Sequence, residues 1–206
     1  MGRRLIPLLI EQGHAVRALV RKGSENKLPE KCEAVFGDAL KKETFSHLIK
    51  DADTFVQLVG TPRPSPAKAK QFREVDLPAV QAGVSSAIEN NIKHFVYVSV
   101  AHPAPIMKAY IAVRMEGERL IRESGMNATV IRPWYVLGPG HWWAYSLLPI
   151  YKMMELIPST RERANRLGLV KLNQMVAALL NSIENPAEGI RILNVPDIRN
   201  AKINET

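Results

Sequence analysis

Three side chains in the middle of the chain have the types and spacing of a proton-transfer site. Ser99 ends a predicted strand, and Tyr110 and Arg114 follow it in a predicted helix. The i, i+4 spacing puts Tyr110 and Arg114 one turn apart on the same helix face. A fixed cation beside a phenol favours the phenolate and lowers its pKa from about 10. We expect Ser99 to bind a substrate carbonyl and Tyr110 to exchange a proton with it, although Tyr-x-x-x-Arg pairs are also common on helix surfaces.

A second group of candidates follows the predicted strand over 15–20. A parallel sheet binds its ligands at the carboxyl ends of its strands, and Arg21 and Lys22 come directly after this one. A basic residue there accommodates the extra phosphate of NADP, and the forked guanidinium of Arg21 suits a phosphate better than Lys22 does. Two solvated charges at a strand end are the alternative interpretation.

Two further strand ends carry candidate cofactor residues. Asp38 follows the predicted strand over 33–36, where its carboxylate either accepts a hydrogen bond from the adenine amine or closes a turn. Gly60 follows the predicted strand over 54–59, and a glycine there lets the backbone approach a ligand closely.

The elements that must position these residues alternate between strands and helices. Apolar runs with little alternation, separated by helices, are typical of a parallel sheet covered on both faces. We expect strands over 15–20, 33–36, 54–59, 94–99, 128–133 and 190–195, helices over about 3–12, 76–90, 110–124 and 172–184, and a Pro-rich basic loop over 61–70. The prediction is an α/β fold, a Rossmann-type doubly wound parallel sheet in a single domain over 1–206. The segment from about 134 to 170 breaks the alternation and is expected to form a substrate-side extension.

Composition narrows the class of protein. A hydrophobic fraction of 46% and a charged fraction of 23% are ordinary for a globular protein, and the single cysteine, Cys32, excludes an internal disulfide and a cysteine-based metal cluster. We predict no metal site. No signal peptide and no run of about 18 uncharged apolar residues is visible, so we expect a cytoplasmic protein without a membrane span. The net charge of +8 comes from scattered residues, so we expect no nucleic-acid partner; the oligomeric state is left open.

Several short stretches resemble the short-chain dehydrogenase/reductase superfamily. They are GDAL at 37–40, LVGTP at 58–62, HFVYVSV at 94–100, YIAVRMEGERLI at 110–121 and ATVIRPWYVLGPGH at 128–141. The similarity is closest to the extended and atypical branches, which include nucleotide-sugar epimerases and NmrA-like NAD(P)-binding proteins. It implies a Rossmann fold that binds NADP, with NAD possible, and it implies that Ser99 orients the substrate carbonyl and Tyr110 is the acid/base. The cofactor contacts that it implies are Gly2, Arg21, Lys22, Asp38, Ala39, Val59, Gly60, Pro133 and Val136.

The chain departs from this family at Arg114. The family carries a lysine there, which lowers the pKa of the tyrosine and holds the nicotinamide ribose. Arginine keeps the charge, but its planar head is larger and does not simply replace an ammonium. Two functions therefore stay open: an NADP-dependent oxidoreductase or epimerase, and a non-catalytic NAD(P)-binding sensor or assembly factor. His102, in the loop before Tyr110, is a candidate substrate contact or an ordinary surface histidine.

The beginning of the chain departs from the family as well. The family begins with a strand and G-x-x-G-x-x-G, and Gly2 matches only the third glycine. The absent strand belongs at the centre of the sheet, between the strands over 15–20 and 54–59. Each buried unpaired backbone group costs about 1–3 kcal/mol, against a total stability of about 5–15 kcal/mol. This cost favours a Met1 internal to a longer protein over a sheet repaired by pairing 15–20 with 54–59; in both cases we expect weak dinucleotide binding.

Aromatic residues in the extension bear on the substrate. Trp134, Trp142 and Tyr145 either line an apolar pocket, rest on a membrane surface with Lys152, or pack in a core. They favour a small apolar substrate, such as a sterol-like, quinone-like or lipid carbonyl, over a sugar nucleotide.

Overall fold

The computed structural model describes residues 1–138, 153, 162 and 165–203. Its strands are β1 (Val16–Val20), β2 (Cys32–Phe36), β3 (Thr54–Gln57), β4 (His94–Val98), β5 (Asn127–Ile131), β6 (Tyr135–Leu137), β7 (Leu169–Lys171) and β8 (Ile190–Leu193). Its α-helices are α1 (Gly2–Glu11), α2 (Ala69–Gln71), α3 (Leu77–Glu89), α4 (Lys108–Glu123), α7 (Leu172–Glu184) and α8 (Val195–Asn200). The short η segments are 3-10 turns at Glu25–Lys27, Lys42–Thr44, Ser46–Leu48 and Pro66–Lys68, and a π-helix, η5, at Phe72–Asp76.

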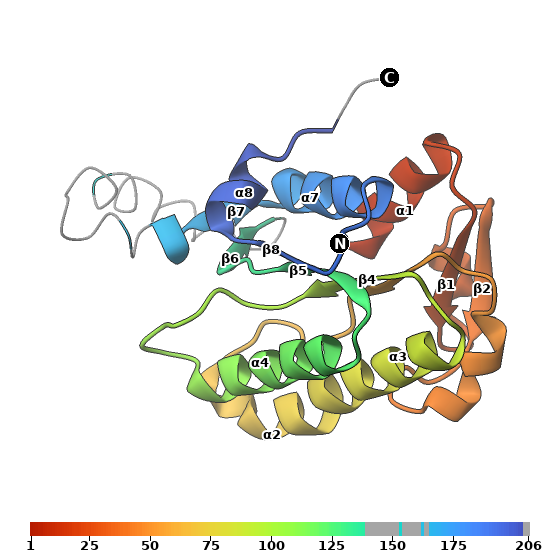
Figure 1. The fold of residues 1–206 in the computed structure, drawn as a ribbon, viewed down its shortest axis with the longest axis horizontal. Coiled ribbons are helices and arrows are strands. Elements are labelled where there is room, and N and C mark those ends of the chain that lie inside the picture. Colours follow the sequence, from red (N-terminus) through yellow and green to blue (C-terminus); the bar gives the residue numbers. More distant parts are fainter. Residues whose placement is uncertain (139–152, 154–161, 163–164, 204–206) are drawn as a thin grey trace.

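The strands form a layer between two layers of helices. The strand order β3-β4-β5-β8 is parallel throughout, β1 pairs with β2 in parallel, and β6 pairs with β7. In Figure 1, α1 and α7 cover one face of the strands, and α3 and α4 cover the other. This arrangement confirms the predicted α/β class with a doubly wound parallel sheet.

The first helix is amphipathic and stops where the sequence predicts. Leu5 and Leu9 lie one turn apart, and both are buried in the cluster that α1 shares with α7. Gly13 has a φ of +84°, in the left-handed region that favours glycine, and its amide donates to the Ile10 carbonyl. This turn reverses the chain and starts β1.

The centre of the sheet is fully covered. Every residue of β4 is buried, and Phe95 and Tyr97 of this strand lie against the α3 and α4 side. Such a strand has an apolar neighbour on both faces, which explains why HFVYV lacks the alternation of a half-exposed strand. Ser99 follows β4 at its carboxyl end, so the sheet presents it where ligands bind.

A gap separates β1 from β3. Among the described residues, β1 pairs only with β2 and β3 pairs only with β4. The alternative in which the strands over 15–20 and 54–59 pair directly is therefore wrong. No strand of the described residues occupies the place between them, as the comparison with the family anticipates.

Two segments differ from the expected loop pattern. The predicted loop over 61–70 ends in helical structure, because Pro66 starts a 3-10 turn that continues through α2 and the π-helix η5 into α3. In the predicted extension, β6 and β7 pair with each other in parallel. None of the described helices is both long and apolar enough to cross a bilayer.

Candidate active site

Ser99 is tied to a buried carboxylate. Its Oγ donates a hydrogen bond to Oε1 of Glu118 at 2.6 Å, and its amide donates to the Ile131 carbonyl at 2.8 Å. Both side chains are almost completely buried. The hydroxyl proton of Ser99 is therefore engaged with Glu118.

Basic side chains surround the Glu118 carboxylate. Arg132 donates from Nε to Oε1 at 2.9 Å and makes a second contact from Nη2 to Oε2, and Nε2 of His102 lies 3.5 Å from Oε1. Burial by itself would raise the pKa of Glu118, but the hydrogen bonds from Arg132 and Ser99 outweigh it and hold that pKa below its usual value. Burial and the charge of Arg132 lower the pKa of His102. At neutral pH the group is therefore an ionised carboxylate, an arginine and a neutral histidine.

Arg114 connects three elements. Its Nη2 lies 2.6 Å from Oδ1 of Asp76, and its Nη1 donates to the Val98 carbonyl at the end of β4 at 3.0 Å. The other oxygen of Asp76 accepts hydrogen bonds from the amide and the hydroxyl of Thr61, at 2.9 Å and 2.5 Å. The guanidinium thus fixes the loop after β3 and the end of β4 to α4.

Gly60 lies directly against this ion pair. A Cβ atom at position 60 would clash with Nη2 of Arg114 and would lie 3.0 Å from Oδ1 of Asp76. The structure therefore gives Gly60 a packing reason to be glycine, beside the expected approach of a ligand.

Tyr110 packs between a cation and an aromatic ring. Its ring centroid lies 5.0 Å from Cζ of Arg114 and 4.9 Å from the ring of Phe72. Burial raises the pKa of Tyr110, and the positive charge of Arg114 opposes that rise without cancelling it. The expectation that the cation lowers this pKa overall is wrong, because desolvation of the phenolate outweighs the attraction. At neutral pH the phenol is a proton donor.

Three of these residues lie on one face of α4. Tyr110, Arg114 and Glu118 are spaced i, i+4, i+8, and Arg114 and Glu118 bond Val98 and Ser99 at the carboxyl end of β4. Their Cα atoms span about 12 Å along the helix, at about 1.5 Å per residue. Ser99 is hydrogen-bonded to Glu118 at the carboxyl end of this row, and Tyr110 lies at its amino end.

The candidate cofactor residues lie beyond β1 and β2. Arg21 and Lys22 are exposed directly after β1. Asp38 accepts a hydrogen bond on Oδ1 from the Leu40 amide, and its own amide donates to Oγ1 of Thr44. Asp38 thus closes a turn, the second of its two interpretations, with one carboxylate oxygen used in it.

The amino end of α1 has the properties of an anion site. The amides of Arg4 and Leu5 donate to the Met1 carbonyl, and the first turn holds no acidic residue. The amides of Gly2 and Arg3 have no carbonyl of the helix within reach, and the helix dipole adds positive potential. This end of α1 fits a phosphate group of a dinucleotide.

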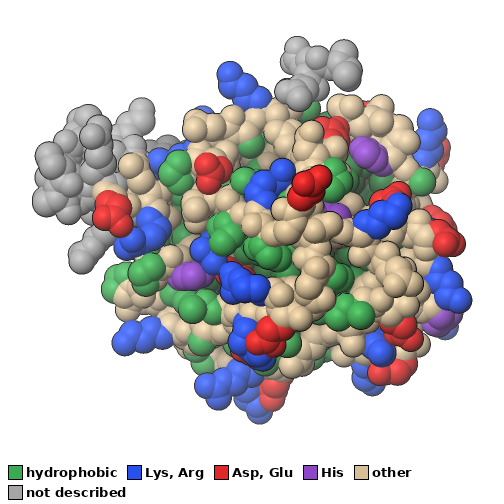
Figure 2. Space-filling view, in the orientation of Figure 1, with side chains coloured by type: hydrophobic (Ala, Val, Ile, Leu, Met, Phe, Trp, Pro, Cys, Tyr) green, Lys and Arg blue, Asp and Glu red, His purple; other side chains and the backbone are tan. Residues whose placement is uncertain are grey.

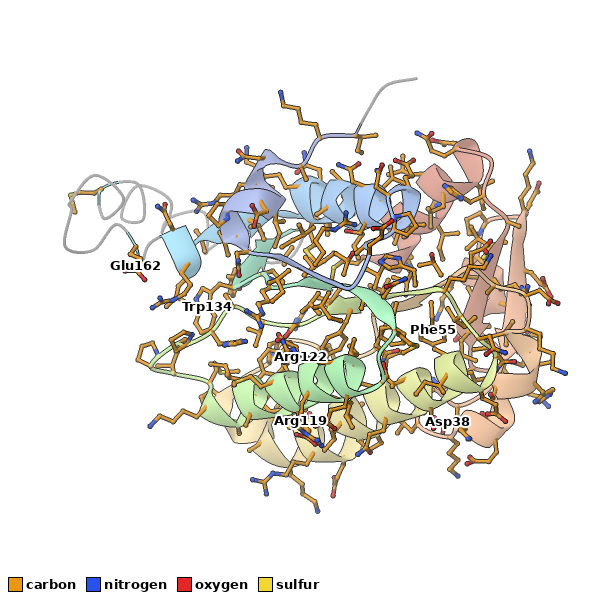
Figure 3. The ribbon with its side chains drawn as sticks, in the orientation of Figure 1. Asp38, Phe55, Arg119, Arg122, Trp134 and Glu162 are labelled. Carbon is orange, nitrogen blue, oxygen red and sulfur yellow. The ribbon has the colours of Figure 1, made fainter. Side chains whose placement is uncertain are left out.

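The remaining candidates lie around β5 to β7. The Pro133 carbonyl accepts a hydrogen bond from the Ala101 amide at 2.9 Å, and Val136 pairs with Val170 across β6 and β7. Trp134 packs against the core cluster on the α7 side. In Figure 3 it lies at the opposite end of the molecule from Asp38. Ala39 and Val59 line the gap beside β1, and Trp142 and Tyr145 lie outside the described residues.

Three residues of the site were not predicted from the sequence. Asp76, Glu118 and Arg132 supply most of its charge, and all three are buried or nearly so. Glu118 could have been found from the sequence, because it lies four residues after Arg114 and therefore on the same face of the predicted helix. Asp76 ends a π-helix, for which the sequence carries no recognisable pattern.

The described residues outside this site were also compared with the pattern of a metal-binding cluster. Within the described part of the chain, no group of three histidine, cysteine, aspartate or glutamate side chains has metal-ligand geometry. The face of the molecule in Figure 2 shows basic and acidic side chains interspersed rather than gathered in a stripe.

Comparison with known proteins places these features in a family. The family model described as NAD(P)H-binding matches residues 1–139. Comparison with curated proteins gave no significant match.

Solved structures share the fold at low sequence identity. The Bordetella bronchiseptica enzyme WbmH, in complex with NAD+, has a TM-score of 0.68 at 17% identity, over 94% of this chain and 71% of its own. A nucleoside-diphosphate-sugar epimerase from Staphylococcus aureus has a TM-score of 0.65 at 19% identity, over 93% and 66%. UDP-glucuronic acid 4-epimerase from Bacillus cereus, in complex with NAD, has a TM-score of 0.66 at 16% identity, over 94% and 73%.

Proposed function

This chain belongs to the NAD(P)H-binding family, and from that premise we propose that it is an NADP-dependent oxidoreductase of the short-chain dehydrogenase/reductase type, or an epimerase of that type. The observation that carries the proposal is the position of Tyr110 against the Arg114 guanidinium, at the carboxyl end of β4. In this fold that edge of the sheet is where the dinucleotide and the substrate meet.

The cofactor is held by residues at the same edge. Gly2 and Arg3 at the amino end of α1 suit the pyrophosphate, and Arg21 with Lys22 suits the additional phosphate of NADP over the diol of NAD. Ala39, Val59 and Gly60 complete the adenosine side, and Pro133 and Val136 face the nicotinamide. When bound, the nicotinamide supplies or accepts the hydride.

The protein supplies the proton. Because burial keeps the Tyr110 phenol protonated at neutral pH, this residue donates a proton to the oxygen of a carbonyl as the carbonyl is reduced. Arg114 stabilises the phenolate that remains, and Ser99 can donate to the substrate oxygen once its hydroxyl turns away from Glu118. The protonated phenol is thus in the state that reduction of a ketone or aldehyde requires.

The substrate that we propose is a small apolar carbonyl compound. Support comes from Trp134, which lies in the β5–β6 connection and is only partly buried against the core, and from the neutral His102 in the loop before α4. Trp142 and Tyr145 extend the same segment in the sequence. A cytoplasmic location remains a prediction.

One observation favours the non-catalytic candidate, an NAD(P)-binding sensor or assembly factor. The two side chains that the enzyme needs beside Tyr110 are already engaged: the Ser99 hydroxyl with Glu118, and the Arg114 guanidinium with Asp76 and the Val98 carbonyl. A protein that keeps these bonds on binding the dinucleotide would hold it without turnover.

Turnover of NADPH in the presence of apolar ketones separates the two candidates. We predict that Tyr110→Phe lowers kcat about 100-fold, since a positioned general acid contributes at least that factor, while the affinity for NADPH measured by fluorescence is unchanged. The matched comparison is Tyr110→Phe against the parent chain at saturating NADPH. Binding of NADPH without consumption by the parent chain would reject the enzyme in favour of the sensor.

A further inference from the structure

One nitrogen of His102 is buried without a hydrogen-bond partner. Nε2 of this ring lies 3.5 Å from Oε1 of Glu118, which is too long for a hydrogen bond of normal strength, and no other polar atom in the described part of the chain bonds it. The backbone beside His102 is held in place, because the Ala101 amide donates to the Pro133 carbonyl at 2.9 Å. A buried polar atom without a partner is costly in a folded protein, so this nitrogen needs a reason.

The Glu118 oxygen that faces this nitrogen is already in use. Oε1 accepts hydrogen bonds from the Ser99 hydroxyl at 2.6 Å and from Nε of Arg132 at 2.9 Å. A carboxylate oxygen offers two lone-pair positions, and these two donors occupy both. The Ser99 hydroxyl and Nε2 of His102 therefore compete for one position, and in this structure the serine holds it.

The charge of Glu118 determines which nitrogen of His102 carries the hydrogen. Burial would raise the pKa of Glu118, but the hydrogen bonds from Arg132 and Ser99 keep it below its usual value, so the carboxylate is ionised and can only accept. Burial and the charge of Arg132 lower the pKa of His102, and Glu118 opposes them without cancelling them, so the ring is neutral at neutral pH. A neutral ring beside an ionised carboxylate is most stable with its hydrogen on Nε2.

We propose that His102 is a positioning residue, whose Nε2–H moves onto Oε1 of Glu118 when the Ser99 hydroxyl turns to a substrate oxygen. The move is about 0.6 Å, from 3.5 Å to the ~2.9 Å that is usual for such a bond. The carboxylate then keeps two donors on this oxygen, which makes it easier for the serine to leave. Only hydrogen bonds are exchanged, and no proton is transferred. This role rests on the proposed function, since it gives Ser99 a substrate, and it differs from the substrate contact expected of His102.

The exchange of donors is tested first on the chain without nucleotide, by NMR of the histidine side-chain nitrogens. The parent chain should show the Nε2–H form of His102. Ser99→Ala removes the competing hydroxyl, so we expect the Nε2–H proton signal of His102 to move downfield and the pKa of His102 to rise, because the ring then donates to an ionised carboxylate. Ser99→Cys is a second variant with the same expected direction, since a thiol is a weak donor.

A matched control removes another buried hydroxyl. Ser182 lies on α7, on the opposite face of the strands from α4, and its Oγ donates to the Ala178 carbonyl. Ser182→Ala should leave the Nε2–H signal and the pKa of His102 as they are in the parent chain. A change of the same size in Ser182→Ala would contradict the proposal, because the signal would then respond to the loss of any buried hydroxyl.

Turnover with NADPH and an apolar ketone gives a second, independent measurement. We expect His102→Leu to lower kcat/KM about tenfold, because Glu118 loses the donor that replaces Ser99. His102→Gln should keep most of the activity, since its side-chain amide can donate to the same oxygen. In a Ser99→Ala background, His102→Leu should lower kcat/KM no further, because the exchange no longer takes place.

Four further results would overturn the proposal. They are an Nδ1–H form of His102 in the parent chain, His102 signals that stay unchanged in both Ser99→Ala and Ser99→Cys, equal kcat/KM for His102→Leu and His102→Gln, and the same loss from His102→Leu with and without the Ser99 hydroxyl. A parent chain that consumes no NADPH would reject the proposed function instead, and the NMR result would then decide whether His102 takes over the Glu118 oxygen.

Discussion

Arg114 makes contacts that a lysine at the same position could not make. Its planar head bonds Asp76 with one nitrogen and the Val98 carbonyl with another, while its face lies against Tyr110. A lysine ammonium is a single point charge and cannot hold this forked arrangement. The arginine therefore combines the electrostatic task expected of a lysine with a structural one.

Removing that charge should destabilise the fold. We predict that Arg114→Met lowers the free energy of unfolding by about 3–5 kcal/mol, because Asp76 is left buried and unpaired. Urea unfolding followed by fluorescence measures it. Adding Asp76→Asn to Arg114→Met should restore part of the loss, and Arg119→Met, on the exposed face of α4 labelled in Figure 3, should change the stability little. Equal losses for Arg114→Met and Arg119→Met would contradict this account of the pair.

His94 makes the stability depend on pH. Burial first, and the charge of Arg191 second, lower its pKa from 6.5 to about 4. The unfolded chain therefore takes up this proton more readily than the folded one. The contribution of His94 is complete above pH 6.5, and up to about 3 kcal/mol is lost as the pH falls toward 4. His94→Gln should flatten the unfolding free energy against pH in this window, and an unchanged slope between pH 6.5 and 4 would exclude His94 as the cause.

The sequence predicted where some of these residues lie, while their roles stay a prediction. The spacing of Tyr110 and Arg114 placed both on one helix face, and Ser99 was expected at a strand end, where the structure has it. The direction of the Tyr110 pKa shift was not, because it depends on how much of the ring Phe72 and the helix cover. The partners Asp76 and Glu118 depend on a π-helix and on tertiary packing.

Helix α4 is held close to the sheet at one glycine. A Cβ atom at Gly117 would lie 2.5 Å from Oη of Tyr97, whose side chain is packed in the core on the α3 and α4 side; burial raises the pKa of this phenol to about 12. The close contact allows Arg114 and Glu118 to reach the ends of β4. Gly117 therefore helps to position the site because it has no side chain that would hold α4 away from the sheet.

Substitution of that glycine should oppose the usual helix trend. Gly117→Ala would stabilise an isolated helix by about 1 kcal/mol, but here we predict a net destabilisation of about 1–3 kcal/mol from the clash with Tyr97. Thermal and urea unfolding measure the difference, with Arg122→Ala on the exposed face of α4 as the control. A stabilised Gly117→Ala variant would show that α4 is not held in close contact at this point.

Elements were predictable where the pattern is local. The run HFVYV and the Leu5–Leu9 spacing identified a buried strand and an amphipathic helix, and Gly13 marked a helix end. The stretch from Pro66 to Asp76 was not predicted as helical, because its turn chemistry resembles a loop and its π-helix is stabilised by the contacts of Phe72 and Asp76.

At the scale of the whole molecule, the pair β1-β2 and the sheet β3-β4-β5-β8 lie on two sides of a cavity that β1 and β3 line. The amino end of α1 and the loop after β3 both border this space. Gly2 and Val59, both proposed to contact the dinucleotide, therefore lie at the border of this space.

The most direct test of this account is hydrogen exchange on the chain alone. Residues 16–20 and 54–57 should exchange faster than residues 94–98, which have a strand on both sides, because the edges facing the gap lack a partner. Protection of all three segments to the same degree would contradict the open gap and would indicate that β1 and β3 pair directly.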